Sequence, residues 1–153
     1  MKKFVLIFFI TLSQLINAQL KEYSFDEINT LVQKKPIIVF LHTDWCRACS
    51  IMKTKTLSNQ EVINKLNSDY YFVSFNAESK EDILFNAKIY KPSTAVRGAH
   101  DLAMHLGKYR NKLSYPTMVV LSKKNEIVFQ NTSVLAPKNL IRLLKDIEHH
   151  EKL

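Results

Sequence analysis

The sequence predicts a single α/β domain with a mixed central sheet of about four to five strands, flanked by helices. Residues 37–41 are apolar at every position, which is typical of a central strand buried on both faces. Helical and strand-like patterns alternate along the rest of the chain. The length of 153 residues suits one domain with a substantial core and is short for two.

Each element has a local signal. Ser24 and Glu27 form a capping box at the start of a helix whose apolar residues follow at helical spacing. Pro137 suits the first turn of a last helix with a leucine-rich stripe. The predicted order is helix 24–32, strand 37–41, helix 46–58, one or two helical turns at 61–66, strand 70–75, helix 99–106, strand 117–121, strand 127–129 and helix 137–147.

The interval between Asn76 and Tyr115 is too long for a plain loop, because about forty residues cross it. Ile83, Leu84 and Ala87 favour a helix at 82–88. We therefore predict a helical insertion over about 78–98, just before the strand at 117–121.

The N-terminal pattern predicts a cleavable signal peptide over residues 1–18. Lys2 and Lys3 precede a short apolar run at 4–12, and the small Ala18 offers a cleavage site before Gln19. The run is too short for a membrane span, which takes ~20 apolar residues. We expect export, to a bacterial periplasm or to the outside, and a mature domain at 19–153.

The chain contains two cysteines, Cys46 and Cys49, separated by two residues. They stand where a helical pattern begins directly after the apolar strand. The free N–H groups and dipole of a first helical turn stabilise an anion, so the first sulfur should be a thiolate near neutral pH. In an oxidising compartment the pair could be a redox couple, an inert structural bridge or half of a metal site.

Two motifs resemble the thioredoxin superfamily. One is Trp-Cys-x-x-Cys at 45–49 after a hydrophobic strand, and the other is Tyr-Pro-Thr at 115–117 leading into a further strand. Asp44 before Trp45, together with Met52 and residues 57–62, looks more like the periplasmic branch represented by the C-terminal domain of DsbD. The resemblance implies a thioredoxin fold and a protein-disulfide oxidoreductase that needs no cofactor.

The resemblance also implies roles for individual residues. Cys46 would be the exposed nucleophile, and Cys49 would resolve the mixed disulfide that Cys46 forms with a partner. Pro116 would be cis, and Tyr115 and Thr117 beside it would bind an extended substrate strand. An ordinary trans-proline that opens an edge strand is the alternative.

Trp45 and Arg47 flank the nucleophile and are further candidates for substrate binding. Trp45 should pack beside the site and shield it, with a purely core role as the alternative. Arg47 either stabilises the thiolate, and with it the reduced form, or faces solvent and contacts partners. With the DsbD-like resemblance, this favours a reductant or isomerase over an oxidant.

The sequence departs from thioredoxin where the family has its proton relay. The buried carboxylate is replaced by Phe40, and the lysine usually paired with it is replaced by Ser74. His42 is the candidate proton relay for the second cysteine, with a structural histidine as the alternative. Asp44 and Glu78 are weaker candidates for the same task.

Metal binding is the alternative function from another class. Cys46 and Cys49 with His100 and His105 loosely fit a zinc site, and the cysteines with one histidine could bind Cu(I) in a metallochaperone of thioredoxin fold. Our preferred interpretation has no resident metal. The expected partners are protein thiols and disulfides and a membrane or periplasmic redox partner, and nucleic acid is not expected.

Overall fold

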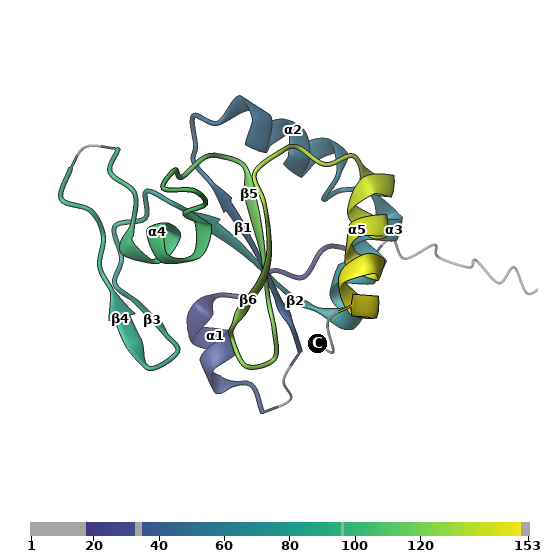
Figure 1. The fold of residues 1–153 in the computed structure, drawn as a ribbon, viewed down its shortest axis with the longest axis horizontal. Helices are drawn as coiled ribbons and strands as arrows, with labels where there is room; N and C mark the ends of the chain where they lie inside the picture. Colours follow the sequence, from purple (N-terminus) through teal and green to yellow (C-terminus); the bar gives the residue numbers. More distant parts are fainter. Residues whose placement is uncertain (1–17, 33–34, 96, 151–153) are drawn as a thin grey trace, which may run out of the picture.

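The computed structural model describes residues 18–32, 35–95 and 97–150, so the predicted signal peptide lies almost wholly outside the described residues. The elements follow the predicted order with one exception (Figure 1). They are α1 Phe25–Thr30, β1 Ile37–His42, α2 Arg47–Lys55, α3 Gln60–Asp69, β2 Tyr71–Asn76, β3 Ile83–Phe85, β4 Lys88–Tyr90, α4 Asp101–Gly107, β5 Thr117–Leu121, β6 Ile127–Asn131 and α5 Pro137–His150.

The central sheet has four strands in the order β2-β1-β5-β6. β1 pairs parallel with β2 and antiparallel with β5, and β5 pairs antiparallel with β6, so the sheet is mixed as predicted. All six residues of β1 are buried, which confirms its predicted central place. The strand pairing therefore fixes the end of β1, and with it the cysteines that follow, at the end of a central strand.

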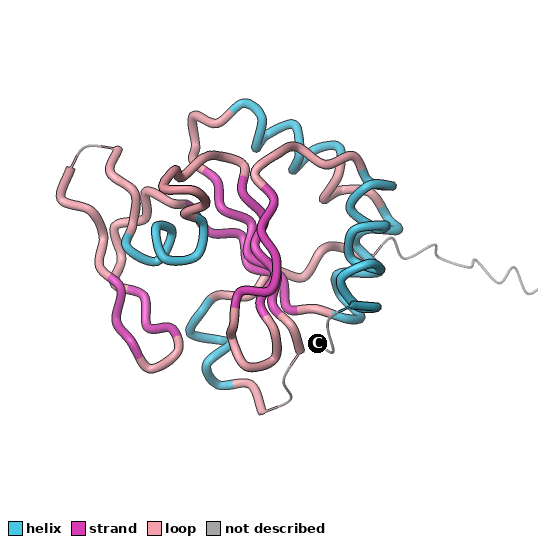
Figure 2. The backbone as a smooth tube through the Cα atoms, viewed as in Figure 1, coloured by secondary structure: helices cyan, strands magenta, loops and turns pink. Residues whose placement is uncertain are grey.

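Helices cover both faces of the sheet (Figures 1 and 2). One face packs against α2, α3 and α5 around residues such as Met52, Leu66 and Leu144. The other packs against α1 and α4 around Phe25 and Leu102. The sheet thus separates two apolar cores, and the start of α2 lies above the first of them.

The predicted caps and helix ends are largely confirmed. The Glu27 N–H donates to the Ser24 hydroxyl over 3.1 Å, and the Ser24 N–H donates to the Glu27 carboxylate over 2.7 Å, which is the predicted capping box. The helical turns expected at 61–66 form the longer helix α3, whose start is capped by the Asn59 side chain. The prediction underestimated this helix because its end is polar.

The insertion is a β-hairpin, and the helix predicted at 82–88 is wrong. Asn86 and Ala87 have φ angles of 51° and 60°, so they form a tight turn that reverses the chain. The flanking strands alternate, with Phe85 and Tyr90 buried and the cross-strand pair of Leu84 and Ile89 exposed. The apolar residues have a spacing compatible with either structure, and packing against the core decides for the strand.

The hairpin belongs to the core of the domain. The Phe85 ring packs edge-on against the Phe25 ring of α1, with 5.1 Å between ring centroids. The Asn29 amide of α1 donates to the Leu84 carbonyl over 2.7 Å. The insertion therefore extends the apolar layer on the α1 and α4 side of the sheet.

Helix α4 corresponds to the helix predicted at 99–106. His100 caps it, because its Nδ1 atom accepts the Leu102 N–H over 3.0 Å. Gly107 ends it where the chain passes close to β1, since a Cβ atom there would lie 2.3 Å from Leu41 Cδ1. A side chain at this position would require the buried Leu41 side chain and that of Leu113 to move.

The segment that follows the predicted cleavage site is tied to the domain by side-chain amides. Asn67 of α3 donates to the Gln19 carbonyl over 2.8 Å and accepts the Lys21 N–H over 2.9 Å. The Tyr23 N–H donates to the Phe72 carbonyl, which places this segment along the outer edge of β2. Within the described residues, every helix is too short or too polar to cross a membrane.

We expect Phe85→Ala to lower the free energy of unfolding by about 3–5 kcal/mol, because it leaves a cavity where an aromatic ring was fully packed. Leu84→Ala, in the same strand but on its exposed face, should change it by about 0.5 kcal/mol or less. Urea denaturation followed by circular dichroism measures both. Equal, small losses would mean that the hairpin is an appendage.

Candidate active site

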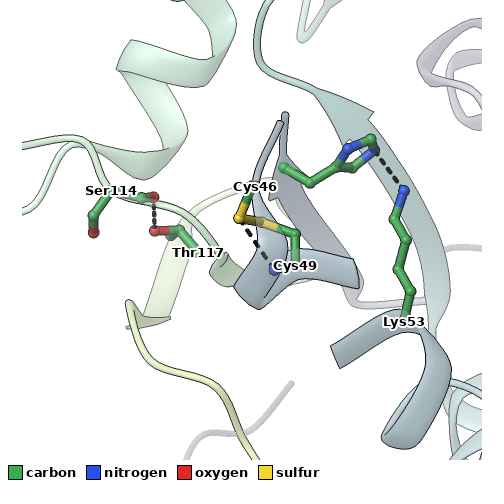
Figure 3. Close-up of a disulfide and its surroundings, with 6 residues drawn as sticks. Cys46, Cys49, Lys53, Ser114 and Thr117 are labelled. Atoms are coloured by element: carbon green, nitrogen blue, oxygen red, sulfur yellow. Dashed lines mark hydrogen bonds between the residues drawn. A yellow bond between two sulfur atoms is a disulfide. The ribbon is translucent and has the colours of Figure 1, made fainter. Parts of the chain in front are cut away.

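The two cysteines form a disulfide at the point where β1 ends and α2 begins (Figure 3). Cys46 is the N-cap of α2, and its Sγ atom accepts the backbone N–H of Cys49 over 3.1 Å. The Cys46 N–H in turn donates to the Thr43 carbonyl over 3.2 Å, which closes the turn that leads out of β1. The helix start thus holds the Cys46 sulfur by a backbone donor.

This geometry distinguishes the two sulfurs. Cys46 is 8% exposed and Cys49 is 2% exposed, so a partner reaches Cys46 first. Upon reduction, the N–H donor and the dipole of α2 favour a thiolate on Cys46. Cys46 was expected to be exposed, whereas both sulfurs are buried in the disulfide form and Cys46 is only the less buried of the two. The roles of nucleophile and resolving cysteine stay predictions.

The loop before β5 lies beside the disulfide, as predicted. The peptide bond between Tyr115 and Pro116 is cis. Thr117 pairs with Leu41 in the sheet, and its hydroxyl donates to the Ser114 carbonyl over 2.7 Å, as Figure 3 shows. Tyr115 packs against the core cluster that contains both cysteines. β5 and the loop before it therefore bring the predicted substrate-binding residues Tyr115, Pro116 and Thr117 to the disulfide.

Trp45 lies on the surface of the site. Its side chain is 57% exposed, which excludes the purely core role. Its ring meets the Tyr115 ring edge-on at 6.1 Å between centroids, and its Nε1–H donates to the Glu78 carboxylate over 3.0 Å. Burial raises the pKa of Tyr115, and the Glu78 charge adds to the shift.

Glu78 and Asp44, the weaker candidates for proton transfer, are engaged in holding the loops around the site. Glu78 opens the insertion and anchors Trp45, which sequence reasoning did not foresee. Asp44 accepts a hydrogen bond of 3.1 Å from the Asn76 amide. Arg47 is the first residue of α2, and its side chain is exposed, so it is accessible to a partner at the rim of the site.

His42 is the last residue of β1, lines a cavity together with both cysteines and is 8% exposed. Its Nε2 atom is 3.2 Å from the Lys53 ammonium, and its ring stacks on Phe40 with 5.7 Å between centroids. Burial lowers the pKa of His42, and the Lys53 charge lowers it further, against smaller opposing effects of Asp44 and the Thr43 backbone. Sequence reasoning missed Lys53, although its place four residues after Cys49 puts both on one helical face.

The two residues that the resemblance aligns with the family's buried acid and its lysine are neighbours in the sheet. Phe40 is fully buried there, and its partner across the parallel β1–β2 pair is Ser74, the other replaced residue.

The histidines of the zinc hypothesis are used elsewhere. His100 is fully buried, with Nδ1 accepting the Leu102 N–H and Nε2 2.9 Å from the Glu81 carbonyl. His105 is exposed and its ring lies 5.3 Å from that of Tyr90. Among the described residues, no three His, Cys, Asp or Glu side chains gather as metal ligands.

A mixed sheet with a Cys-x-x-Cys pair at a helix start and a cis-proline beside it defines the thioredoxin-like class. A family model described as a thioredoxin-like domain matches residues 26–148, and the chain belongs to this family. The fold and the cysteine pair support thiol–disulfide exchange as its chemistry.

Solved structures of the same fold are distant in sequence. A thioredoxin from Thermus thermophilus is 20% identical, with a TM-score of 0.60 over 85% of this chain and 88% of that one. A DsbH oxidoreductase is 15% identical, with a TM-score of 0.59 over 90% of each chain. A disulphide isomerase from Xylella fastidiosa Temecula1 is 13% identical, with a TM-score of 0.52 over 75% and 79%. Comparison with curated proteins found no match.

Because Trp45 is the one tryptophan in the chain, its fluorescence reports on this site alone. We expect Glu78→Ala to free the indole, which should lower its anisotropy and increase quenching by acrylamide. Glu78→Gln keeps an oxygen acceptor and should behave like the wild-type protein. The same change in both variants would mean that the carboxylate charge, and not the hydrogen bond, holds the ring.

Proposed function

We propose that this protein is an exported thiol–disulfide oxidoreductase that acts through the Cys46–Cys49 couple, more as a reductant or isomerase than as an oxidant. The observation that carries the proposal is the disulfide itself. It caps a helix by its less buried sulfur and lies beside a cis-proline loop.

The exchange proceeds in two displacements. The Cys46 thiolate attacks one sulfur of a partner's disulfide, that bond breaks, and the other partner sulfur leaves as a thiolate that takes a proton from solvent. The Cys49 thiolate then attacks Cys46, and the remaining partner sulfur leaves in the same way. Two electrons pass to the partner, and the Cys46–Cys49 disulfide remains.

The exposed residues around Cys46 suit a protein partner. The backbone of Tyr115 can pair with an extended substrate strand, next to the exposed ring of Trp45 and the cation of Arg47. The oxidised couple must then be reduced again, which calls for a membrane or periplasmic redox partner. The preference for reduction rests on the resemblance of residues 44–62 to the DsbD branch. A Cys46 thiolate stabilised by the helix start and by Arg47 stabilises the reduced form, which by itself makes the couple more oxidising. The argument from Arg47 toward a reductant is therefore wrong.

The reduction potential of the couple tests the proposal. We expect a value near or below about −220 mV after equilibration with glutathione or dithiothreitol, as the resemblance to the DsbD branch implies. Cys46→Ser and Cys49→Ser should each abolish turnover, and only the second should accumulate mixed disulfides. A value near about −120 mV would make the protein a disulfide donor.

If no reversible couple exists, the function lies in one of the two alternatives. Stoichiometric uptake of Cu(I) or zinc by the reduced protein would then identify a metal carrier. A disulfide that resists mild reductant, and whose removal mainly lowers stability, would identify a structural bridge.

Export rests on the N-terminal sequence pattern. We expect the mature protein to begin at Gln19, because Ala18 is the small residue before the cut. Intact-mass measurement of protein expressed in a bacterial host and recovered from its periplasm checks this. A mass that retains residues 1–18, with the protein found in the cytosol, would contradict it.

A further inference from the structure

A polar cavity of about 230 Å³ opens beside the disulfide. Its lining brings together both cysteines and five polar residues: His42, Thr43, Asp44, Ser50 and Lys53. The cavity reaches the buried Cys49, whose thiol must lose a proton before it can attack. The thioredoxin-type acid that could take this proton is absent, because Phe40 occupies its place.

Lys53 reaches this space from α2. Its ammonium lies 3.2 Å from His42 Nε2 and 5.9 Å from the centroid of the Phe40 ring. Its side chain also lines a neighbouring cavity together with Ser74, the position from which the family's lysine would come. A lysine from the helix therefore occupies the region that a lysine from β2 would otherwise supply.

The contact defines the state of His42. An ammonium can only donate, so Nε2 accepts and the ring proton of the neutral imidazole lies on Nδ1. Burial and the Lys53 charge both lower the pKa of His42, whereas Asp44 and the Thr43 backbone raise it less. Both effects favour the neutral imidazole, whose one basic nitrogen lies beside a lysine that is mostly exposed.

We propose that His42 takes the proton of Cys49 when the mixed disulfide is resolved, and that Lys53 positions it by holding its Nε2 lone pair toward the shared cavity. This inference rests on the proposed exchange at Cys46 and concerns its second step.

The step balances as follows. Lys53 turns into solvent and frees Nε2, and the S–H bond of Cys49 breaks with its proton passing to Nε2. The electron pair left on Cys49 forms the bond to Cys46, and the bond between Cys46 and the partner breaks with its pair leaving on the partner sulfur. The imidazolium, whose pKa is lowered, then returns its proton to solvent through the open cavity.

The test separates the two steps of exchange. The reduced protein is mixed with a chromophoric aryl disulfide (dithiobisnitrobenzoate) in a stopped-flow instrument. Attack by Cys46 releases the first equivalent of aryl thiolate, and resolution by Cys49 releases the second. If the first phase is absent, the proposed exchange at Cys46 is wrong. If the first phase is normal, the rate of the second phase tests the role of His42 separately.

In the second phase we expect His42→Gln to slow resolution about 10²-fold or more at neutral pH, the usual scale of general-base catalysis. The difference should shrink at high pH, where Cys49 ionises unaided. The first phase should be unchanged. Equal second-phase rates at neutral pH would overturn the proposal.

Lys53 is tested without disturbing a buried residue. Lys53→Gln removes the neighbouring cation, so the pKa of His42 should rise. In the pH profile of the resolution rate, the rise in rate should move to higher pH by the same amount. An NMR titration of the imidazole proton resonances measures the pKa of His42, and stopped-flow measurements at a series of pH values give the profile of the resolution rate. Lys53→Arg should restore both toward wild type.

Lys55→Gln is the matched control, because it removes the same charge from the exposed last turn of the same helix. It should leave the pKa of His42 and the rate profile in place. If Lys53→Gln behaves like Lys55→Gln, or if it raises the pKa of His42 without moving the rate profile, Lys53 has only a structural role and the proposal is wrong.

Discussion

The burial of β1 on both faces is the constraint on which the site depends. Its neighbours β2 and β5 hold it in register, and helices close both faces around it. Because β1 is paired on both sides and its side chains pack into both cores, the position of its end is fixed. Cys46 and the first turn of α2 follow from that point, and Thr117 is brought there by its pairing with Leu41. The redox pair therefore depends on a strand that takes no part in the chemistry.

The rim of the site is held by polar contacts between loops. Glu78 ties the insertion to Trp45, and Asn76 ties the end of β2 to Asp44. Each contact joins segments about thirty residues apart in sequence, so each exists only once the sheet has formed. The insertion contributes to this rim through its first residue, while its hairpin completes the core near α1.

Much of the site could be predicted, because local patterns carried it. The cysteine spacing, the strand before it and the Tyr-Pro-Thr motif located five of the candidate residues, and the loss of the buried acid was visible at Phe40. Lys53 was missed because a single lysine within a helix has no distinctive pattern. Its contact with His42 arises from the packing of α2 over β1. The hairpin was misread because three apolar residues suit either period, and the turn at Asn86 and Ala87 lacks the usual glycine.

By itself the sequence determined the order of the elements outside the insertion, the central strand and the pair of sulfurs at a helix start. These depend on hydrophobic periodicity, capping and spacing, which act between near neighbours along the chain. The tertiary structure alone decided the shape of the insertion, the exposure of Trp45 and the pairing of His42 with Lys53. Those depend on which side chains meet across elements, and packing between distant segments has no signature in local sequence.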